Sequence, residues 1–389
     1  MSLPAIAGGE PAFPEPLPFV RPTVPALDRV TTRVASSYDR GILTNGPIVR
    51  EFEAAAAERL GVPHVIAVSS CTAGLMLCLR VLAPDGPVVL PSFTFSASAH
   101  AVVWNGLDPR FVECDPASFQ IDTDSAASRI AGAGALLATH VFGAPCAAET
   151  VESIGARAGI PVLFDAAHGF GGSRAGRPLG GFGAAEVFSL SPTKVVVAGE
   201  GGIIATRDDA LADALRIGRD YGNPGDYDTR FVGLNARMSE LHAAIGIESL
   251  AGLDERLAQR RRIVDRYRGG LAELPGVSVQ RIDPADESTY KDFTIAFDAA
   301  AFGLTRDEVV TALRAEGIDT RNYFSPPVHR QHAYRDVEPC DLPVTDEVAG
   351  RVVSLPIYVS LTEAQIDTIT RVLAALHHHA DRVRTAVAG

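Results

Sequence analysis

The sequence predicts an α/β protein: a three-layer αβα large domain with a mostly parallel sheet, followed by a smaller C-terminal α+β domain. Short apolar runs alternate with helical stretches through the first part of the chain. These runs are nearly continuous, as expected for strands of a parallel sheet that helices cover on both faces. The pattern changes near residue 238, where a long charged stretch begins. We therefore expect an N-terminal arm at residues 1–25, a large domain at 26–250 and a small domain at 251–389.

The elements of the large domain follow in order. A turn at 43–47 precedes a helix that ends at Gly61, because proline suits a first helical turn and glycine stops a helix. Strands are then predicted at 64–68, 88–90, 110–113, 135–138 and 161–164, with helices at 72–82, 96–104 and 149–158. A largely apolar run begins at Glu186 and ends at the hydroxyl residue Ser189, before a turn. A second apolar run covers 203–206.

The small domain is reached through a helical, strongly charged stretch at 239–269. Acidic residues are interspersed among its arginines, which is typical of a solvated connecting helix rather than a nucleic-acid-binding surface. Beyond it, strands are predicted at 293–297 and 352–355, and helices at 305–316 and 362–375. Three consecutive histidines at 377–379 cannot share one helix face, so they indicate a frayed terminal helix, and no metal site is predicted.

Composition argues against several classes of function. The 389 residues carry a formal net charge of −12, which argues against broad binding to nucleic acid or to an acidic membrane. Five widely spaced cysteines with no C-x-x-C pair suit a reduced compartment, and the start of the chain lacks the features of a signal peptide. Residues 130–148 lack Asp, Glu, Lys and Arg, but their glycines and Pro145 favour a buried strand with turns over a membrane span. We expect a cytoplasmic protein.

Lys194 is the first candidate for chemistry. It follows the run that passes through Ser189, and its neighbourhood is apolar. Desolvation lowers the pKa of a lysine and makes its amine a usable nucleophile. The alternative is a lysine at the end of a strand whose charge reaches water along its aliphatic stem. This stretch alone supports both interpretations.

Two further features lie where strands end. Asp165 ends a predicted strand, and the carboxyl ends of parallel strands line the ligand crevice of this architecture. Its carboxylate can keep a heterocyclic nitrogen protonated or bind a metal, or it can simply cap the next turn. Small residues at 69–74 lie where a strand passes into a helix, and the helix start near Thr72 favours a phosphate. A plain N-cap by Ser70 or Thr72 is the alternative.

Together these pieces fit pyridoxal phosphate, which needs a lysine for a Schiff base, an acidic partner for its ring nitrogen and a phosphate site. The candidates are Lys194, Asp165 and the helix start at Thr72. Ser189 offers a further hydroxyl to the phosphate. Phe95 follows a strand and offers a ring that stacks on the cofactor.

The ordered motifs resemble the sugar aminotransferases of the DegT/DnrJ/EryC1/StrS family, which are fold-type I pyridoxal phosphate enzymes. Among them are Pro-Ser-Phe-Thr-Phe at 91–95 and Phe-Asp-Ala-Ala-His at 164–168. The others lie at 43–47, 51–53, 70–73, 188–194, 199–202, 233–240, 327–329 and 355–356. The resemblance spans residue 41 to the end of the chain, and the number of ordered motifs argues against coincidence.

Carried over by position, the resemblance implies that Lys194 forms the Schiff base and that Asp165 is the partner of the pyridinium nitrogen. It also implies that Thr72, Ala73 and Ser189 bind the phosphate.

The same resemblance implies three more contacts with the cofactor. Phe95 would cover the ring, and His168, where many relatives have glutamine, would lie near the 3-oxygen. Asn235 would reach the phosphate across a subunit interface, which implies a homodimer with shared active sites.

For the substrate, the resemblance implies that Tyr323 and His329 line the sugar pocket. Lys291 and Arg237 are candidates for binding the nucleotide's diphosphate. A solvent-facing surface charge is the alternative for each of these two cations.

The implied reaction moves an amino group from an amino acid, L-glutamate or L-glutamine, to a nucleotide-linked keto-sugar in deoxyaminosugar biosynthesis. The residues at 69–72 and 290–294 favour a dTDP-4-keto-6-deoxyhexose. Some deoxygenating relatives have histidine in place of the lysine, and others use an iron–sulfur cluster whose cysteine set this sequence lacks, so Lys194 favours transamination. The alternatives are a 3-keto-sugar or cyclitol (inosose) aminotransferase and a non-catalytic regulator with the same fold.

Overall fold

The computed structural model describes residues 1–337 and 339–388 and contains one large sheet of seven strands. The strands pair in the order β1-β9-β8-β5-β4-β2-β3. They are β1 (His64–Val68), β2 (Val88–Pro91), β3 (Pro109–Val112), β4 (Ala135–Thr139), β5 (Val162–Asp165), β8 (Ala185–Ser189) and β9 (Gly202–Thr206). β9 is antiparallel to both of its neighbours, and the other four pairs are parallel. The prediction of a mostly parallel sheet is therefore confirmed.

Successive residues of the strands face two different cores, which gives this part of the molecule three layers. In β1, Val65 and Ala67 face one core, and Ile66 and Val68 face the other. The first core is closed by α2 (Pro47–Leu60), α5 (Thr123–Ser128), α6 (Ala148–Ala158) and α8 (Glu240–Ala251). The second is closed by α3 (Cys71–Leu82), α4 (Ser96–Trp104) and α7 (Asp209–Gly218). Short apolar strands thus lie buried between two layers of helices, as predicted.

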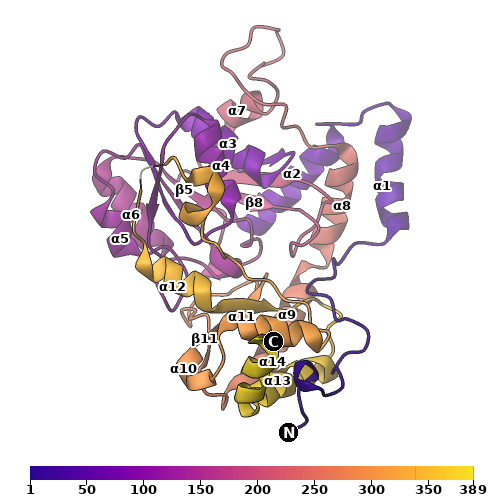
Figure 1. The fold of residues 1–389 in the computed structure, drawn as a ribbon. Helices are drawn as coiled ribbons and strands as arrows, with labels where there is room; N and C mark the ends of the chain where they lie inside the picture. The colour runs from indigo at the N-terminus through magenta and orange to yellow at the C-terminus, as the bar shows by residue number, and fades with distance from the viewer. Residues whose placement is uncertain (338, 389) are drawn as a thin grey trace.

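A second, smaller core lies in the C-terminal part of the chain (Figure 1). Its antiparallel sheet contains β10 (Val277–Val279), β11 (Phe293–Phe297) and β12 (Val352–Leu355). The helices here are α9 (Leu253–Leu271), α10 (Ala299–Phe302), α11 (Arg306–Ala315), α12 (Pro343–Arg351), α13 (Glu363–His378) and α14 (Ala380–Ala388). Figure 1 shows both chain ends beside this smaller core. The remaining short elements are β6 (Ser173–Arg174), β7 (Arg177–Pro178), η1 (Ala5–Ala7), η2 (Val141–Gly143), η3 (Val328–Arg330) and η4 (His332–Tyr334).

The charged stretch at 239–269 is two helices, so the prediction of one helical stretch is wrong in this respect. Gly252 separates α8 from α9, and it has non-helical dihedral angles. The sequence pattern hid this break because charged residues continue on both sides of the glycine. α9 contributes to both cores: Leu257 packs in the large core, while Ile263 and Tyr267 pack in the small one.

The N-terminal region contains a helix that the sequence did not predict, α1 (Leu27–Asp39). Val30 is its one deeply buried large apolar residue, so the helix carries only a weak apolar stripe. The arm before it packs on the small core. The backbone N–H of Leu17 donates to Gly317 O, and the Glu316 carboxylate accepts from two arm N–H groups.

The remaining expectations concern membranes and the histidine run. Across the described residues, helices fall short of the length and apolarity that a membrane span requires. Residues 130–148 form β4 and η2, as the buried-strand interpretation predicted. The prediction of a frayed end at 377–379 is wrong, because α13 continues through His378 and the His377 ring lies 2.8 Å from Phe302 O.

Candidate active site

A cavity of about 290 Å³ surrounds Lys194 at the carboxyl ends of the parallel strands. Eight of the residues singled out in the sequence line it: Thr72, Phe95, Asp165, His168, Ser189, Lys194, Lys291 and Tyr323. They come from segments far apart in the chain. The position agrees with the rule that ligands bind beyond the carboxyl ends of strands in such sheets.

Lys194 is half-buried in the turn that follows β8. Burial, and then the positive charge of Lys291, lower the pKa of Lys194 from its ordinary value of 10.5 to about 8. Near neutral pH a sizeable minority of the amine is therefore unprotonated and available as a nucleophile or base. This environment favours the first interpretation, a lysine whose amine is poorly solvated.

Asp165 lies at the end of β5 and is 3% exposed. Its Oδ2 accepts a hydrogen bond of 2.6 Å from Ser98 Oγ, and its Oδ1 accepts one of 3.0 Å from the backbone N–H of Ala167. Neither partner is a cation, so the buried carboxylate still favours a positively charged group beside it. Sequence reasoning missed Ser98, because a serine near the start of a helix ordinarily reads as a cap.

The sequence left two interpretations of the start of α3 open, a plain N-cap and a phosphate site. Ser70 is the N-cap, and its Oγ accepts from the backbone N–H of Ala73 at 3.0 Å. Thr72, the residue before Ala73, lines the cavity. β9 approaches this turn closely, because a Cβ on Gly202 would lie 2.6 Å from the backbone N of Cys71. A side chain at position 202 would therefore clash with the first turn of α3, and the positive end of this helix suits an anion.

A buried polar cluster of three residues, Lys291, Asp292 and His168, lies beside Lys194. Lys291 is 5% exposed, and its Nζ donates to Asp292 Oδ1 at 2.7 Å, so the alternative of a surface charge is wrong for this residue. Asp292 Oδ2 lies 4.0 Å from His168 Nδ1, and both atoms are buried without a hydrogen-bond partner. Burial and the two lysines lower the pKa of His168 well below its ordinary value, so this imidazole is neutral.

Tyr323 forms a wall of the cavity that the N-terminal arm supports. Its ring meets Phe19 of the arm edge to face at 5.9 Å, and Lys291 Nζ lies 5.8 Å from its centroid. Phe19 is 4% exposed. The arm therefore contributes to the shape of the cavity without lining it.

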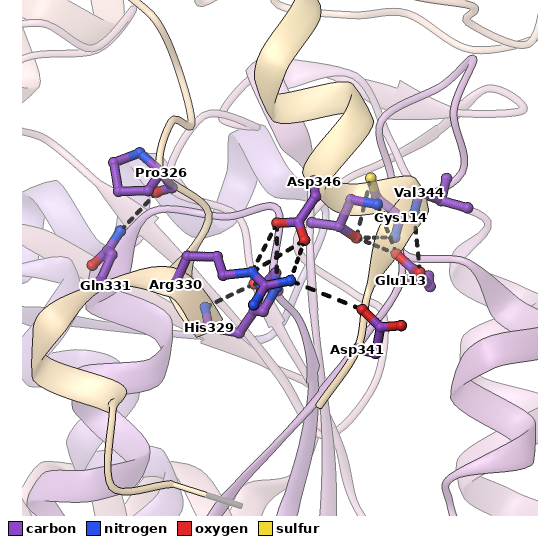
Figure 2. A network of polar contacts seen from close by, with 11 residues as sticks. Glu113, Cys114, Pro326, His329, Arg330, Gln331, Asp341, Val344 and Asp346 are labelled. Carbon is purple, nitrogen blue, oxygen red and sulfur yellow. Dashed lines mark hydrogen bonds and ion pairs between the residues drawn. The ribbon is translucent and has the colours of Figure 1, made fainter. Parts of the chain in front are cut away.

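His329 does not line the cavity around Lys194 in this single chain, and its place in the sugar pocket stays a prediction. Its side chain is 2% exposed, with Nδ1 2.7 Å from Ser92 Oγ and Nε2 3.4 Å from Asp346 Oδ1. Figure 2 shows His329 and Arg330 pointing toward Asp346, in a network that also includes Glu113, whose carboxylate accepts from the Thr345 N–H at the start of α12. These contacts hold the imidazole away from the cavity and attach this segment to the large sheet.

Three other predicted residues also lie outside the cavity lining of this single chain: Ala73, Asn235 and Arg237. Asn235 is exposed. The Arg237 guanidinium donates to Asp220 Oδ1 at 2.8 Å and to Asn235 Oδ1 at 3.2 Å. Sequence reasoning also missed Ser191 and Thr193, which line the cavity in the turn before Lys194.

The cavity fits pyridoxal phosphate in four respects. Lys194 supplies an amine with a lowered pKa, and Asp165 supplies a buried carboxylate without a cationic partner. The start of α3 suits the phosphate, and Phe95, 59% exposed, offers an aromatic face at the cavity. The unpartnered Nδ1 of His168 is a further polar atom that a ligand would satisfy.

Comparisons with known proteins agree with this fit. The family model described as the DegT/DnrJ/EryC1/StrS aminotransferase family matches residues 27–374. The GDP-perosamine synthase of Caulobacter vibrioides is 34% identical over 337 residues, which cover 85% of this chain and 90% of that protein. The dTDP-4-amino-4,6-dideoxy-D-glucose transaminase of Escherichia coli is 30% identical over 365 residues, covering 92% of this chain and 98% of that protein.

A solved structure resembles the whole chain. The crystal structure of DesI in the presence of its TDP-sugar product superposes with a TM-score of 0.91 and 38% identity. The match covers 99% of this chain and 98% of DesI, so it includes the N-terminal arm, which the family model leaves out.

The lowered pKa of Lys194 gives a prediction for the cofactor-free protein. The chain has only two lysines, Lys194 and Lys291, so amine acetylation read by peptide mass spectrometry resolves each of them. We expect the acetylation rate of Lys194 to rise with a pH midpoint near 8, and the midpoint to move upward in Lys291→Met, which removes a neighbouring positive charge. A wild-type midpoint at the ordinary lysine value of 10.5 would contradict this.

Proposed function

The chain belongs to the DegT/DnrJ/EryC1/StrS aminotransferase family and is a pyridoxal phosphate-dependent transaminase, and we propose that it aminates a nucleotide-linked keto-sugar. The amino donor in this proposal is L-glutamate or L-glutamine, and the acceptor is a dTDP-4-keto-6-deoxyhexose. The observation that carries the proposal is the pairing in one cavity of a lysine of lowered pKa with the buried Asp165 carboxylate.

Lys194 is proposed as the residue that forms the Schiff base and moves the proton. Its amine, with a pKa of about 8, accepts the proton that leaves the donor's α-carbon and returns a proton in the second half-reaction. Bound pyridoxal phosphate supplies a ring that withdraws electrons from that carbon. Asp165 keeps the ring nitrogen protonated, because a buried carboxylate favours a positive charge beside it.

The phosphate is proposed to bind at the start of α3. Thr72 and Ser189 line the cavity there and offer hydroxyl groups. Phe95 stacks on the ring, and His168 lies near the 3-oxygen as a neutral imidazole, able to donate from one nitrogen and accept at the other. Ala73 takes part through its backbone N–H, which Ser70 Oγ engages in this structure.

The sugar is proposed to lie against Tyr323. Support for its identity comes from two relatives: the Escherichia coli protein is named for a dTDP-4-amino-4,6-dideoxy sugar, and DesI was crystallised with a TDP-sugar product. Arg237 remains a candidate for the diphosphate. In this proposal it acts from the partner subunit, together with Asn235, since neither lines the cavity of its own chain.

A homodimer with shared sites is proposed because large exposed apolar side chains flank the loop of Asn235. Leu43 and Leu241 lie next to Glu240, whose N–H donates to Leu43 O, and Tyr221 donates its N–H to Leu234 O. Val232 in the same loop is 71% exposed. Such a concentration of exposed apolar residues is typical of a subunit interface.

The proposed function is tested with a panel of acceptors. Purified enzyme with L-glutamate is offered a dTDP-4-keto-6-deoxyhexose, its 3-keto isomer and an inosose, and products are read by mass spectrometry. We expect amine product from the 4-keto sugar, and none in Lys194→Ala, which also loses the visible-edge absorbance of the bound cofactor. If the enzyme aminates only the 3-keto sugar or only the inosose, the proposed 4-keto-sugar acceptor is wrong.

The shared site is tested with Asn235→Ala. We expect the dissociation constant for the cofactor to rise about 10-fold, because a hydrogen bond to a charged group contributes roughly 1.5 kcal/mol or more. Sedimentation should still show a dimer. Asn223→Ala is the matched control, since the Asn223 amide oxygen accepts only from N–H groups of its own loop in the described part of the chain. Equal cofactor affinity in Asn235→Ala and wild type would argue against the shared site.

A further inference from the structure

The two lysines of the chain share one cavity. Lysine and arginine together number 35, and 33 of these are arginines, so only two lysines are present in the whole sequence. Lys194 and Lys291 both line the cavity around the proposed cofactor site. One of them has a role in the proposed function as the Schiff-base lysine. The role of the other follows from its contacts.

Lys291 is buried with hydrogen-bonding capacity to spare. A lysine ammonium has three N–H donors, and Nζ makes one hydrogen bond to a protein acceptor in the described part of the chain, Asp292 Oδ1. Asp292 Oδ2 and His168 Nδ1 lie 4.0 Å apart beside it, and neither makes a hydrogen bond with the described residues. Buried polar donors are nearly always paired, so the remaining N–H donors of Lys291 are available to an acceptor group of a ligand.

The Lys291 backbone is fixed in place by a buried arginine. Arg260 of α9 donates from Nη2 to Lys291 O at 2.7 Å and from Nε to Tyr290 O at 2.8 Å. Asp292 then fixes the direction of Nζ. A cation held from both ends loses little further freedom when a ligand binds, which favours specific recognition of an anion.

We propose that Lys291 binds the α-carboxylate of the amino donor. This proposal rests on the proposed function and assigns a subsite to the first of its two substrates. The α-carboxylate is attached directly to the carbon that gives up its proton to Lys194, so its binding group must lie beside Lys194. The diphosphate of a nucleotide sugar is several bonds away from the keto carbon, so a cation next to Lys194 lies too close to the reacting carbon to bind it.

The other charges around the cavity agree with this assignment. His168 is neutral because its pKa lies well below the ordinary value, and Asp165 and Glu200 are acidic. Among the described lining residues, Lys291 is therefore the basic side chain that remains once Lys194 has reacted with the cofactor. Asp292 balances Lys291 before the donor binds, which avoids an uncompensated buried charge.

The test compares two ligands that differ only in the α-carboxylate. 2-Methyl-L-glutamate lacks an α-hydrogen and so binds without reacting further. 4-Amino-4-methylpentanoate has a methyl group in place of the α-carboxylate and likewise lacks an α-hydrogen. Calorimetry gives the dissociation constants of both with cofactor-loaded enzyme. The variant is Lys291→Met with Asp292→Asn, which removes both charges together and leaves no unpaired buried ion. Asp292→Asn alone is the matched control that keeps the cation.

We expect 2-methyl-L-glutamate to bind at least about 10-fold more weakly to the double variant. Loss of a hydrogen bond between charged groups changes a dissociation constant by about this factor. Its affinity for Asp292→Asn should equal or exceed that of wild type. 4-Amino-4-methylpentanoate should bind all three proteins alike, and the absorbance of the bound cofactor should be unchanged.

Three results would overturn the proposal. One is an equal loss of affinity for both ligands in the double variant, and another is no loss for either. The third is loss of bound cofactor in the double variant but not in Asp292→Asn, which would assign Lys291 to the cofactor. Failure of the proposed function is distinguished from all three, because it appears as a wild-type enzyme that converts no keto-sugar of the panel.

Discussion

The site depends on keeping one lysine amine poorly solvated among other charges. Lys194 stands at the edge of a buried sheet, where removal of water and the charge of Lys291 both disfavour its protonated form. The same burial would be costly for Asp165 if Ser98 and a backbone N–H did not hydrogen-bond its carboxylate. The sheet edge brings these groups together, since β5 ends at Asp165 and β8 ends shortly before Lys194.

The smaller core contributes to the same cavity through three contacts. α9 begins in the large core and ends in the small one, and its Arg260 fixes the backbone at Tyr290 and Lys291. The N-terminal arm follows the small core and supports Tyr323 through Phe19. The segment of Lys291 is also attached to the large domain, because the backbone N–H groups of Thr289 and Asp292 donate to Gly143 O and Phe142 O.

Much of the fold and part of the site could be predicted from the sequence. Continuous apolar runs located the strands, and Asp165 and Lys194 stood out because polar residues directly after buried runs lie at a sheet edge. The burial of Lys291 could not be predicted, because it depends on Asp292 and on Arg260 from a distant helix. The contacts of His329 could not be predicted for a similar reason: Ser92, which fixes its ring, lies 237 residues away in the chain. Resemblance to a family carries residue identities, while long-range contacts decide where a side chain points.

The central claim is that Lys194, and not Lys291, reacts with the cofactor. The chain has no other lysine, so the two outcomes are separable in one experiment. Enzyme loaded with pyridoxal phosphate is reduced with borohydride, digested and mapped by mass spectrometry. The account predicts the reduced cofactor on the peptide that contains Lys194, with Lys291 unmodified. Cofactor attached to Lys291, or attached to neither lysine, would contradict it.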